Sequence, residues 1–175
     1  QLTTSALAGD FSRIDRSVGA FFEYTYDNSS NFSFVAGIRA DSHNNLGNFI
    51  TPRFHLRYNP WKEATFRLSA GRGKRAANVI AENQQLLASS RQLHIVGGDG
   101  GKLYGLNPEI AWNYGASFLQ AFKIWGKNAE LSVDFYRTHF DNQVVVDLDH
   151  SPQQALFYNL DGKSFANSLQ AEVSI

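Results

Sequence analysis

The sequence predicts an all-β fold, namely an antiparallel up-and-down meander of about seven or eight strands. Apolar and polar residues alternate along most of the 175-residue chain, which places the two kinds of side chain on opposite faces of a sheet. Short runs of Asn, Asp, Gly, Ser and Pro separate the alternating segments, as turns between strands do. Aromatic residues make up 14% of the chain, and such residues favour strands.

The first two strands are predicted on either side of the polar turn at residues 27–30. The first strand begins at about Ile14. The apolar faces of the two strands carry Val18, Ala20, Phe22, Tyr24 and Tyr26, and Phe32, Phe34, Ala36, Ile38 and Ala40. A stretch rich in Asn and Gly follows, so we expect a long connection over residues 42–51.

Residues 52–75 predict a hairpin that turns at residues 59–63. Its apolar positions are Phe54, Leu56, Tyr58, Phe66 and Leu68, and its polar positions include Arg53, His55, Arg57 and Arg67. One face of the hairpin is therefore apolar and the other is strongly cationic. A soluble sandwich buries its apolar face, whereas a membrane barrel turns that face toward lipid.

A long connection is predicted over residues 72–107, because the alternation stops after Gly71. Val79, Ile80, Asn83, Leu86 and Leu87 recur at helical spacing, which predicts a short helix within residues 78–89. The glycine-rich run at residues 97–101 predicts a flexible loop. Connections of this length in a compact domain are usually functional.

Alternation resumes at Pro108 and predicts the remaining strands. One strand ends before a turn near residues 125–128. The next starts at Ala129 and is expected to run on through Val146, and the last returns from about Ala155 and ends at Ile175.

The predicted connections alternate in length along the chain. The short ones are residues 27–31, 59–64 and 122–128, and the long ones are residues 42–51, 72–107 and 140–164. Alternate connections of a meander lie at the same end of the sheet, so this pattern is typical of outer-membrane barrels with short periplasmic turns and long external loops. A tilted strand of about ten residues also spans roughly 25 Å, the height of the apolar band. No run of about 18 apolar residues is present, which excludes a transmembrane helix.

Composition excludes several other classes of function. Lys and Arg together number 16, as do Asp and Glu, so the basic excess of nucleic-acid-binding proteins is missing. The chain has no Cys, and its five His residues are scattered, so no metal site or other cofactor is predicted. Loop residues Asp99, Asp147 and Asp149 suit either Ca²⁺ or turn formation. The GRGK run at residues 71–74 lacks P-loop spacing, and no nucleophile–base–orienter set is visible, so we expect no enzyme.

Four segments carry a family resemblance. Residues 51–83, TPRFHLRYNPWKEATFRLSAGRGKRAANVIAEN, followed by LASSR at residues 87–91, resemble the mid-barrel segment of TonB-dependent outer-membrane receptors. The segments NPEIAWNYGASF (107–118), FYRTHFDNQVVVDLD (135–149) and NLDGKSFANSLQAEV (159–173) resemble the pieces that follow it. The Ala-Glu-Asn and Ala-Ser-Ser-Arg sequences look most like receptors of the Bacteroidetes group.

The resemblance implies a 22-stranded barrel of the Gram-negative outer membrane, filled by a plug domain. TonB and the proton-motive force would move the plug to import an iron-siderophore, cobalamin, a metal or a glycan. The implied partners are the protein's own plug, TonB, outer-membrane lipid and a small-molecule or glycan ligand, with no nucleic acid. The chain has no plug and no TonB box, so we expect residues 1–175 to form one partial β-barrel domain.

Two sets of residues are candidates for function. The first set, on the polar face, is expected to contact the plug or to solvate a wet interior. Its members are Glu23, Arg39, Arg53, Arg57, Arg67, Glu130 and Asp134. The second set, in the external loop, is expected to bind an anionic ligand or to order the loop itself. Its members are Arg72, Lys74, Arg75, Glu82, Asn83 and Arg91.

Three alternatives remain open at this point. A complete eight-stranded outer-membrane barrel with an adhesion or structural role requires its first and last strands to pair. A soluble β-domain that binds carbohydrate requires its aromatic faces to pack together. An outer-membrane barrel enzyme requires a catalytic triad in the lumen or at the rim.

Overall fold

The computed structural model describes residues 14–96 and 102–175. The predicted flexible loop at residues 97–101, with Asp99, lies outside the described residues, as do residues 1–13. In the described part of the chain, no helix has the length and hydrophobicity needed to cross a membrane.

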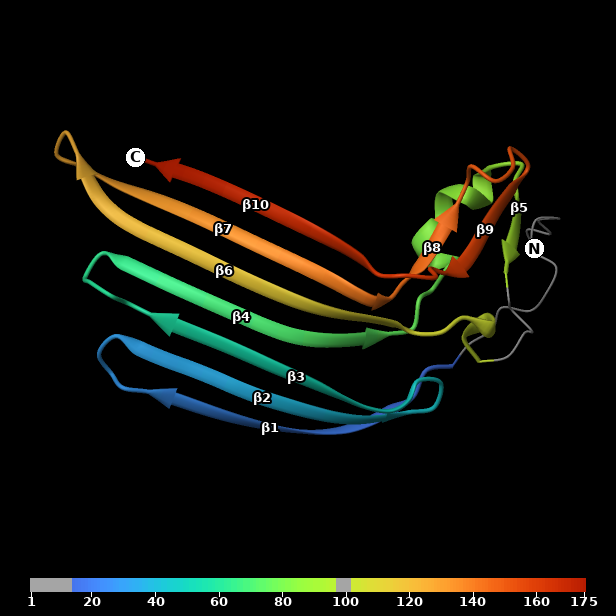
Figure 1. Cartoon of the computed structure of the whole chain (residues 1–175), viewed down its shortest axis with the longest axis horizontal. Helices are drawn as coiled ribbons and strands as arrows, with labels where there is room; N and C mark the ends of the chain where they lie inside the picture. Colours follow the sequence, from blue (N-terminus) through green and yellow to red (C-terminus); the bar gives the residue numbers. More distant parts are fainter. Residues whose placement is uncertain (1–13, 97–101) are drawn as a thin grey trace.

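Seven strands form the main sheet, and every neighbouring pair is antiparallel. In spatial order they are β1 (Ser17–Asp27), β2 (Phe32–His43), β3 (Gly47–Tyr58), β4 (Ala64–Arg75), β6 (Glu109–Ile124), β7 (Lys127–Asn142) and β10 (Ser164–Ser174). Figure 1 shows them as one curved layer, and β1 and β10 each have a single neighbour in it. The predicted antiparallel meander is confirmed as an open, curved sheet, which we call the wall.

The pairing register gives the sheet two distinct faces. On the apolar face, one row across the strands consists of Phe34, Leu56, Leu68, Ala116, Phe135 and Leu169. On the polar face, the adjacent row consists of Ser33, Arg57, Arg67, Ser117, Asp134 and Gln170. No second layer of described residues covers the apolar face, and Val18 and Leu169 are 81% and 73% exposed. The packed faces of a soluble sandwich are therefore absent from the described sheet.

The two longest connections fold together at one end of the sheet (Figure 1). They contain the 3-10 helices η1 (Ala81–Ala88) and η2 (Lys102–Gly105) and the strands β5 (Gln92–Ile95), β8 (Val144–Asp147) and β9 (Gln154–Asn159). Strand β9 pairs in parallel with β5 and antiparallel with β8. Their core consists of Val79, Leu86, Leu106, Ala155 and Phe157. We call the described residues of 76–108 and 143–163 the loop module.

One predicted connection is wrong. Residues 42–51 are not a long loop, because the β2–β3 ladder continues to the pair His43–Gly47 and leaves a three-residue turn. Gly47 has a φ of 70°, and the Nδ1 atom of His43 accepts hydrogen bonds from the backbone N–H groups of Asn45 and Leu46. The turn is therefore ordered by local hydrogen bonds, although its polar composition resembles that of a loop. The other short connections lie at the opposite end from the loop module, as predicted (Figure 1).

The ends of the last strands also differ from the prediction. Strand β7 does not run on through Val146, because it ends at Asn142 and residues 144–147 join the small sheet as β8. The return from Ala155 likewise belongs to β9, and β10 begins at Ser164. The predicted helix within residues 78–89 is present as η1, a 3-10 helix whose regular conformation breaks at Asn83 (φ −127°, ψ 40°).

Candidate functional site

The polar face brings together all seven residues of the first candidate set. Cross-strand partners lie on the same face of a sheet. Glu23 is opposite Gly37, which is opposite Arg53, and Arg39 is two residues from Gly37 on the same strand. Arg57, Arg67 and Asp134 share one row, and Glu130 lies four residues from Asp134 on β7. Strand alternation therefore collects charges from five strands on a single face.

Three of these charges, those of Glu23, Arg39 and Arg53, are paired within the sheet. The guanidinium of Arg53 pairs with the Glu23 carboxylate across Gly37. A Cβ atom at Gly37 would lie 2.8 Å from Nε of Arg53, so the glycine leaves room for this pair. Arg39 donates from Nε and Nη2 to both carboxylate oxygens of Asp41 at 2.8 Å. Asp41 is only 7% exposed, which makes this bidentate pair part of the wall.

The centre of the polar face carries charges without such partners. Arg57 and Arg67 are directly opposite each other, and no described carboxylate lies within ion-pair distance of either. Arg57 makes one long hydrogen bond, 3.4 Å from Nε to Oδ1 of Asn59. Like charges that face each other across a ladder are destabilising. The pair therefore favours an anionic group supplied from outside this sheet.

A shallow hollow of about 420 Å³ lies over this arginine pair. Small side chains line it beside the charged ones. These lining residues include Ser33, Ser69, Gly115, Ser117, Asp134 and Tyr136. Small residues leave space above the backbone, so another polypeptide segment can approach the arginines closely.

In the second candidate set, Arg75 connects the wall to the loop module. Its Nε donates to Oε2 of Glu109 at 2.6 Å, and its two Nη atoms donate to the Glu82 carboxylate at 3.1 Å each. Glu109 is 7% exposed, and its other oxygen accepts the backbone N–H of Val144 at 3.1 Å. This cluster joins the end of β4, helix η1 and the starts of β6 and β8.

Sequence reasoning missed Glu109 as a functional candidate. Glu109 lies within the segment NPEIAWNYGASF (107–118), and nothing in that segment indicates a partner for its carboxylate. The available signal was a lone acidic residue between a proline and an apolar strand. Only the β4–β6 register, which places Arg75 opposite Glu109, identifies that partner.

The remaining loop candidates also have partners inside the chain. Nη1 of Arg91 donates to three backbone carbonyls, those of Leu148 at 2.7 Å and of Ser151 and Gln154 at 3.3 Å. The Asn83 amide donates to the carbonyl of Val79. These contacts show what the side chains do within the loop module, and their predicted role in ligand binding stays a prediction.

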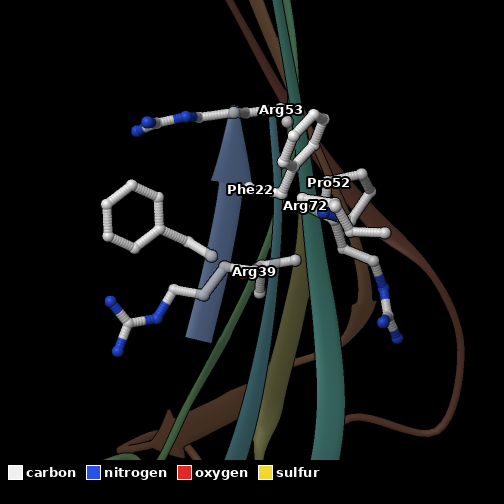
Figure 2. A pocket seen from close by; sticks show the side chains of 9 residues that line it. Phe22, Arg39, Pro52, Arg53 and Arg72 are labelled. Atoms are coloured by element: carbon white, nitrogen blue, oxygen red, sulfur yellow. The ribbon is translucent and has the colours of Figure 1, made fainter. Parts of the chain in front are cut away.

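Arg72 and Lys74 occupy a place where two strands separate. The β3–β4 ladder ends at the pair Arg53–Gly71, next to Pro52, which has no N–H to donate. Beyond it, Arg72 Nη1 donates to the carbonyl of Ile50 at 3.2 Å, and Lys74 Nζ donates to that of Leu46 at 2.9 Å. A hollow of about 350 Å³ lies here, and Figure 2 shows Arg72 projecting to the opposite side from Arg39 and Arg53.

The described residues offer no group of three side chains that could hold a metal ion. At the predicted Ca²⁺ or turn position, Oδ1 of Asp147 accepts the backbone N–H groups of Asp149 and His150 at 2.9 and 3.1 Å. This is the hydrogen bonding of a turn.

A sequence profile described as TonB dependent receptor-like, beta-barrel, matches residues 3–173. The chain belongs to the TonB-dependent receptor β-barrel family. The predicted family is thus confirmed, and this receptor segment is part of an outer-membrane barrel of Gram-negative bacteria. The family comprises receptors and transporters and is not an enzyme family. The finer likeness to Bacteroidetes receptors stays a prediction.

Solved receptor structures share the fold of this receptor segment. The siderophore receptor PirA from Pseudomonas aeruginosa matches with a TM-score of 0.63 and 16% identity, over 90% of this chain and 28% of PirA. PirA from Acinetobacter baumannii matches with a TM-score of 0.63 and 12% identity, over 97% of this chain and 27% of that one. A variant of the ferric enterobactin receptor PfeA from Pseudomonas aeruginosa matches with a TM-score of 0.62 and 16% identity, over 92% of this chain and 24% of PfeA.

The segment spans about a quarter of the length of these receptors. A search of curated proteins found no match.

Proposed function

We propose that this chain forms part of the barrel wall of a TonB-dependent receptor, which imports an iron-siderophore through a 22-stranded, plug-filled barrel. The observation that carries the proposal is the two-faced open sheet. No described residues cover its apolar face, and no described carboxylate pairs with the two arginines at the centre of its polar face. In a membrane barrel the first face meets lipid and the second meets the lumen. The solved structures described as siderophore and ferric enterobactin receptors favour a siderophore over cobalamin or a glycan.

The arginine pair gives the polar face a specific role in this proposal. Arg57 and Arg67 would bind a carboxylate of the receptor's own plug domain, which would occupy the hollow between Ser33 and Ser117. A carboxylate between two guanidinium groups removes their mutual repulsion and accepts charge-assisted hydrogen bonds. The contact would hold the plug in the closed barrel until TonB pulls on it.

Growth under iron limitation tests the proposed import. The gene for the full-length receptor is deleted, and purified ferric siderophores are supplied one at a time as the only iron source. We expect growth on at least one siderophore to require the gene and to be restored by a plasmid copy. The siderophore assignment would be overturned if the deletion strain grew as well as its parent on every siderophore but failed to grow when cobalamin or a glycan was the nutrient supplied.

The plug contact is tested by charge reversal at Arg67. An Arg67→Glu receptor places a carboxylate opposite Arg57, and this new pair competes with the plug carboxylate. We expect the plug to become more accessible to protease in purified receptor, while Arg67→Lys stays close to wild type. Unchanged protease sensitivity of a folded Arg67→Glu receptor would contradict the contact.

A further inference from the structure

The turn between β2 and β3 is closed by an imidazole ring. Nδ1 of His43 accepts the backbone N–H groups of Asn45 at 3.1 Å and of Leu46 at 3.2 Å. An imidazole nitrogen accepts hydrogen bonds only while it carries no proton, and a protonated imidazole is a donor at both nitrogens. His43 is half-buried, so protons from the solvent can reach it. The closed turn therefore requires a neutral His43.

Two other turns of the chain use the same kind of hydrogen bond with a different acceptor. Oδ1 of Asp147 accepts the backbone N–H groups two and three residues ahead of it, at 2.9 and 3.1 Å. Oδ1 of Asn28 accepts those two, three and four residues ahead of it, at 3.0 Å each. Histidine is the side chain whose charge ordinarily changes between about pH 5 and 8. Of these three turns, the one at His43 is thus the one that mild acid can deprive of its acceptor.

The same turn holds the three residues that precede β1. Oδ1 of Asn44 accepts the backbone N–H of Arg16 at 2.9 Å, and its Nδ2 donates to the carbonyl of Ile14 at 2.7 Å. Nδ2 of Asn45 donates to Oδ1 of Asp15 at 2.8 Å. The backbone N–H of Asn44 also donates to the carbonyl of Arg16 at 3.1 Å. Because these bonds come from residues of the turn, opening of the turn removes what holds the segment in place.

The segment before β1 borders the loop module. Asp15 lines a hollow of about 480 Å³ together with Gln84 of η1 and Tyr104 of η2. On the other side of the turn, the carbonyl of Leu46 accepts Nζ of Lys74 on β4 at 2.9 Å. The turn therefore connects the wall to one border of this hollow, and a change at His43 reaches both.

Charged side chains around the turn come from three elements in the described part of the chain. Those on β2 are Asp41 and its partner Arg39, those before β1 are Asp15 and Arg16, and the one on β4 is Lys74. Asp41 lies two residues from His43 on the same face of β2, because side chains alternate along a strand. A protonated ring is therefore attracted toward the Asp41 carboxylate and away from the backbone of the turn.

The turn lies at the same end of the sheet as the loop module, since alternate connections of a meander share an end (Figure 1). In an outer-membrane barrel, the end with the long connections lies outside the cell. The pH at His43 is therefore the pH of the external medium.

We propose that His43 is a proton-sensitive latch at the external end of the receptor. The neutral imidazole closes the turn at residues 44–46, which binds residues 14–16 beside the hollow. In acid medium the imidazole takes up a proton, both backbone hydrogen bonds are lost, and residues 14–16 are released. The latch acts on the external end whichever nutrient the receptor imports.

Hydrogen exchange of the purified full-length receptor tests the latch between about pH 8 and 5. Each rate is divided by the intrinsic rate of the same amide at that pH. We expect protection of the Asn45, Leu46 and Arg16 amides to fall together as the pH falls, by up to about ten-fold per pH unit, the limit for one proton. His43→Asn keeps an acceptor that does not titrate, so protection should then be the same at every pH.

The matched control is His139→Asn, which removes an imidazole near the same end of β7 and should keep the pH dependence of the wild type. The amides that donate to Asn28 provide an internal reference, and their protection should not change with pH. This comparison within the wild type needs no variant, so it decides even where His43→Asn fails to fold.

Four results would overturn the latch. They are pH-independent protection of the Asn45 and Leu46 amides, an equal loss in the Asn28 turn, a pH dependence that persists in His43→Asn, and an Arg16 amide that stays protected after the turn has opened. Nutrient uptake is measured separately, so failure here leaves the proposed import untouched.

Discussion

Removal of the Glu109 carboxylate is expected to release the loop module from the wall. Glu109 is 7% exposed and accepts hydrogen bonds from Arg75 Nε at 2.6 Å and Val144 N at 3.1 Å. Glu109→Ala leaves both donors without this acceptor, and an unsatisfied buried donor costs about 1–3 kcal/mol. Arg75 is 62% exposed and can turn to water, so we expect a total of about 2–4 kcal/mol.

Hydrogen exchange of the full-length receptor measures this loss. Local opening of residues 144–147 should become easier by the same 2–4 kcal/mol, which corresponds to about 30- to 700-fold faster exchange. The control is Glu82→Gln, because the Glu82 side chain is 41% exposed and its pair with Arg75 is worth at most about 1 kcal/mol. Unchanged exchange in Glu109→Ala, or an equally large effect in Glu82→Gln, would refute the role of Glu109 as the buried connection.

Two further predictions concern the wall itself. Gly37→Ala places a Cβ 2.8 Å from Nε of Arg53, so we expect it to disturb the Arg53–Glu23 pair and lower barrel stability by about 1–3 kcal/mol in urea unfolding. Gly73→Ala meets nothing within 4 Å and should be close to neutral, and the same loss in both variants would argue against the close approach. Leu68→Lys puts a charge on the lipid side and should cost about 2–4 kcal/mol in the same measurement. Ser69→Lys, on the lumen side, should cost much less, and a reversed order would mean that the two faces are assigned wrongly.

The main sheet was predictable because its signal is local. Alternation along a single strand, as at Phe54 to Arg57, determines which side chains share a face. The lengths of the connections then predict which strand ends lie at the same end of the sheet. The turn at residues 44–46 was missed because hydrogen bonds from the backbone to His43, rather than apolar residues, extend the ladder there.

The loop module was not predictable from local pattern. Its small sheet pairs β5 with β9, which lie some sixty residues apart in sequence, and short strands of this kind carry little alternation. For the candidate sites, charge type and face followed from the sequence. The ion-pair partners of these residues could not be predicted from the sequence, because the pairs Arg75–Glu109 and Arg53–Glu23 depend on the register of separate strands.

Adjacent residues on β7 show directly which face of the sheet meets lipid. A single cysteine is introduced into the full-length receptor, as Asp134→Cys in one variant and Phe135→Cys in another; residues 1–175 contain no competing Cys. Each variant is labelled with a fluorophore and reconstituted with brominated lipid. We predict strong quenching by brominated lipid at position 135. At position 134 we predict weak quenching, and a change in emission when the plug domain is deleted. Strong quenching at position 134 with none at position 135 would contradict this assignment of the faces.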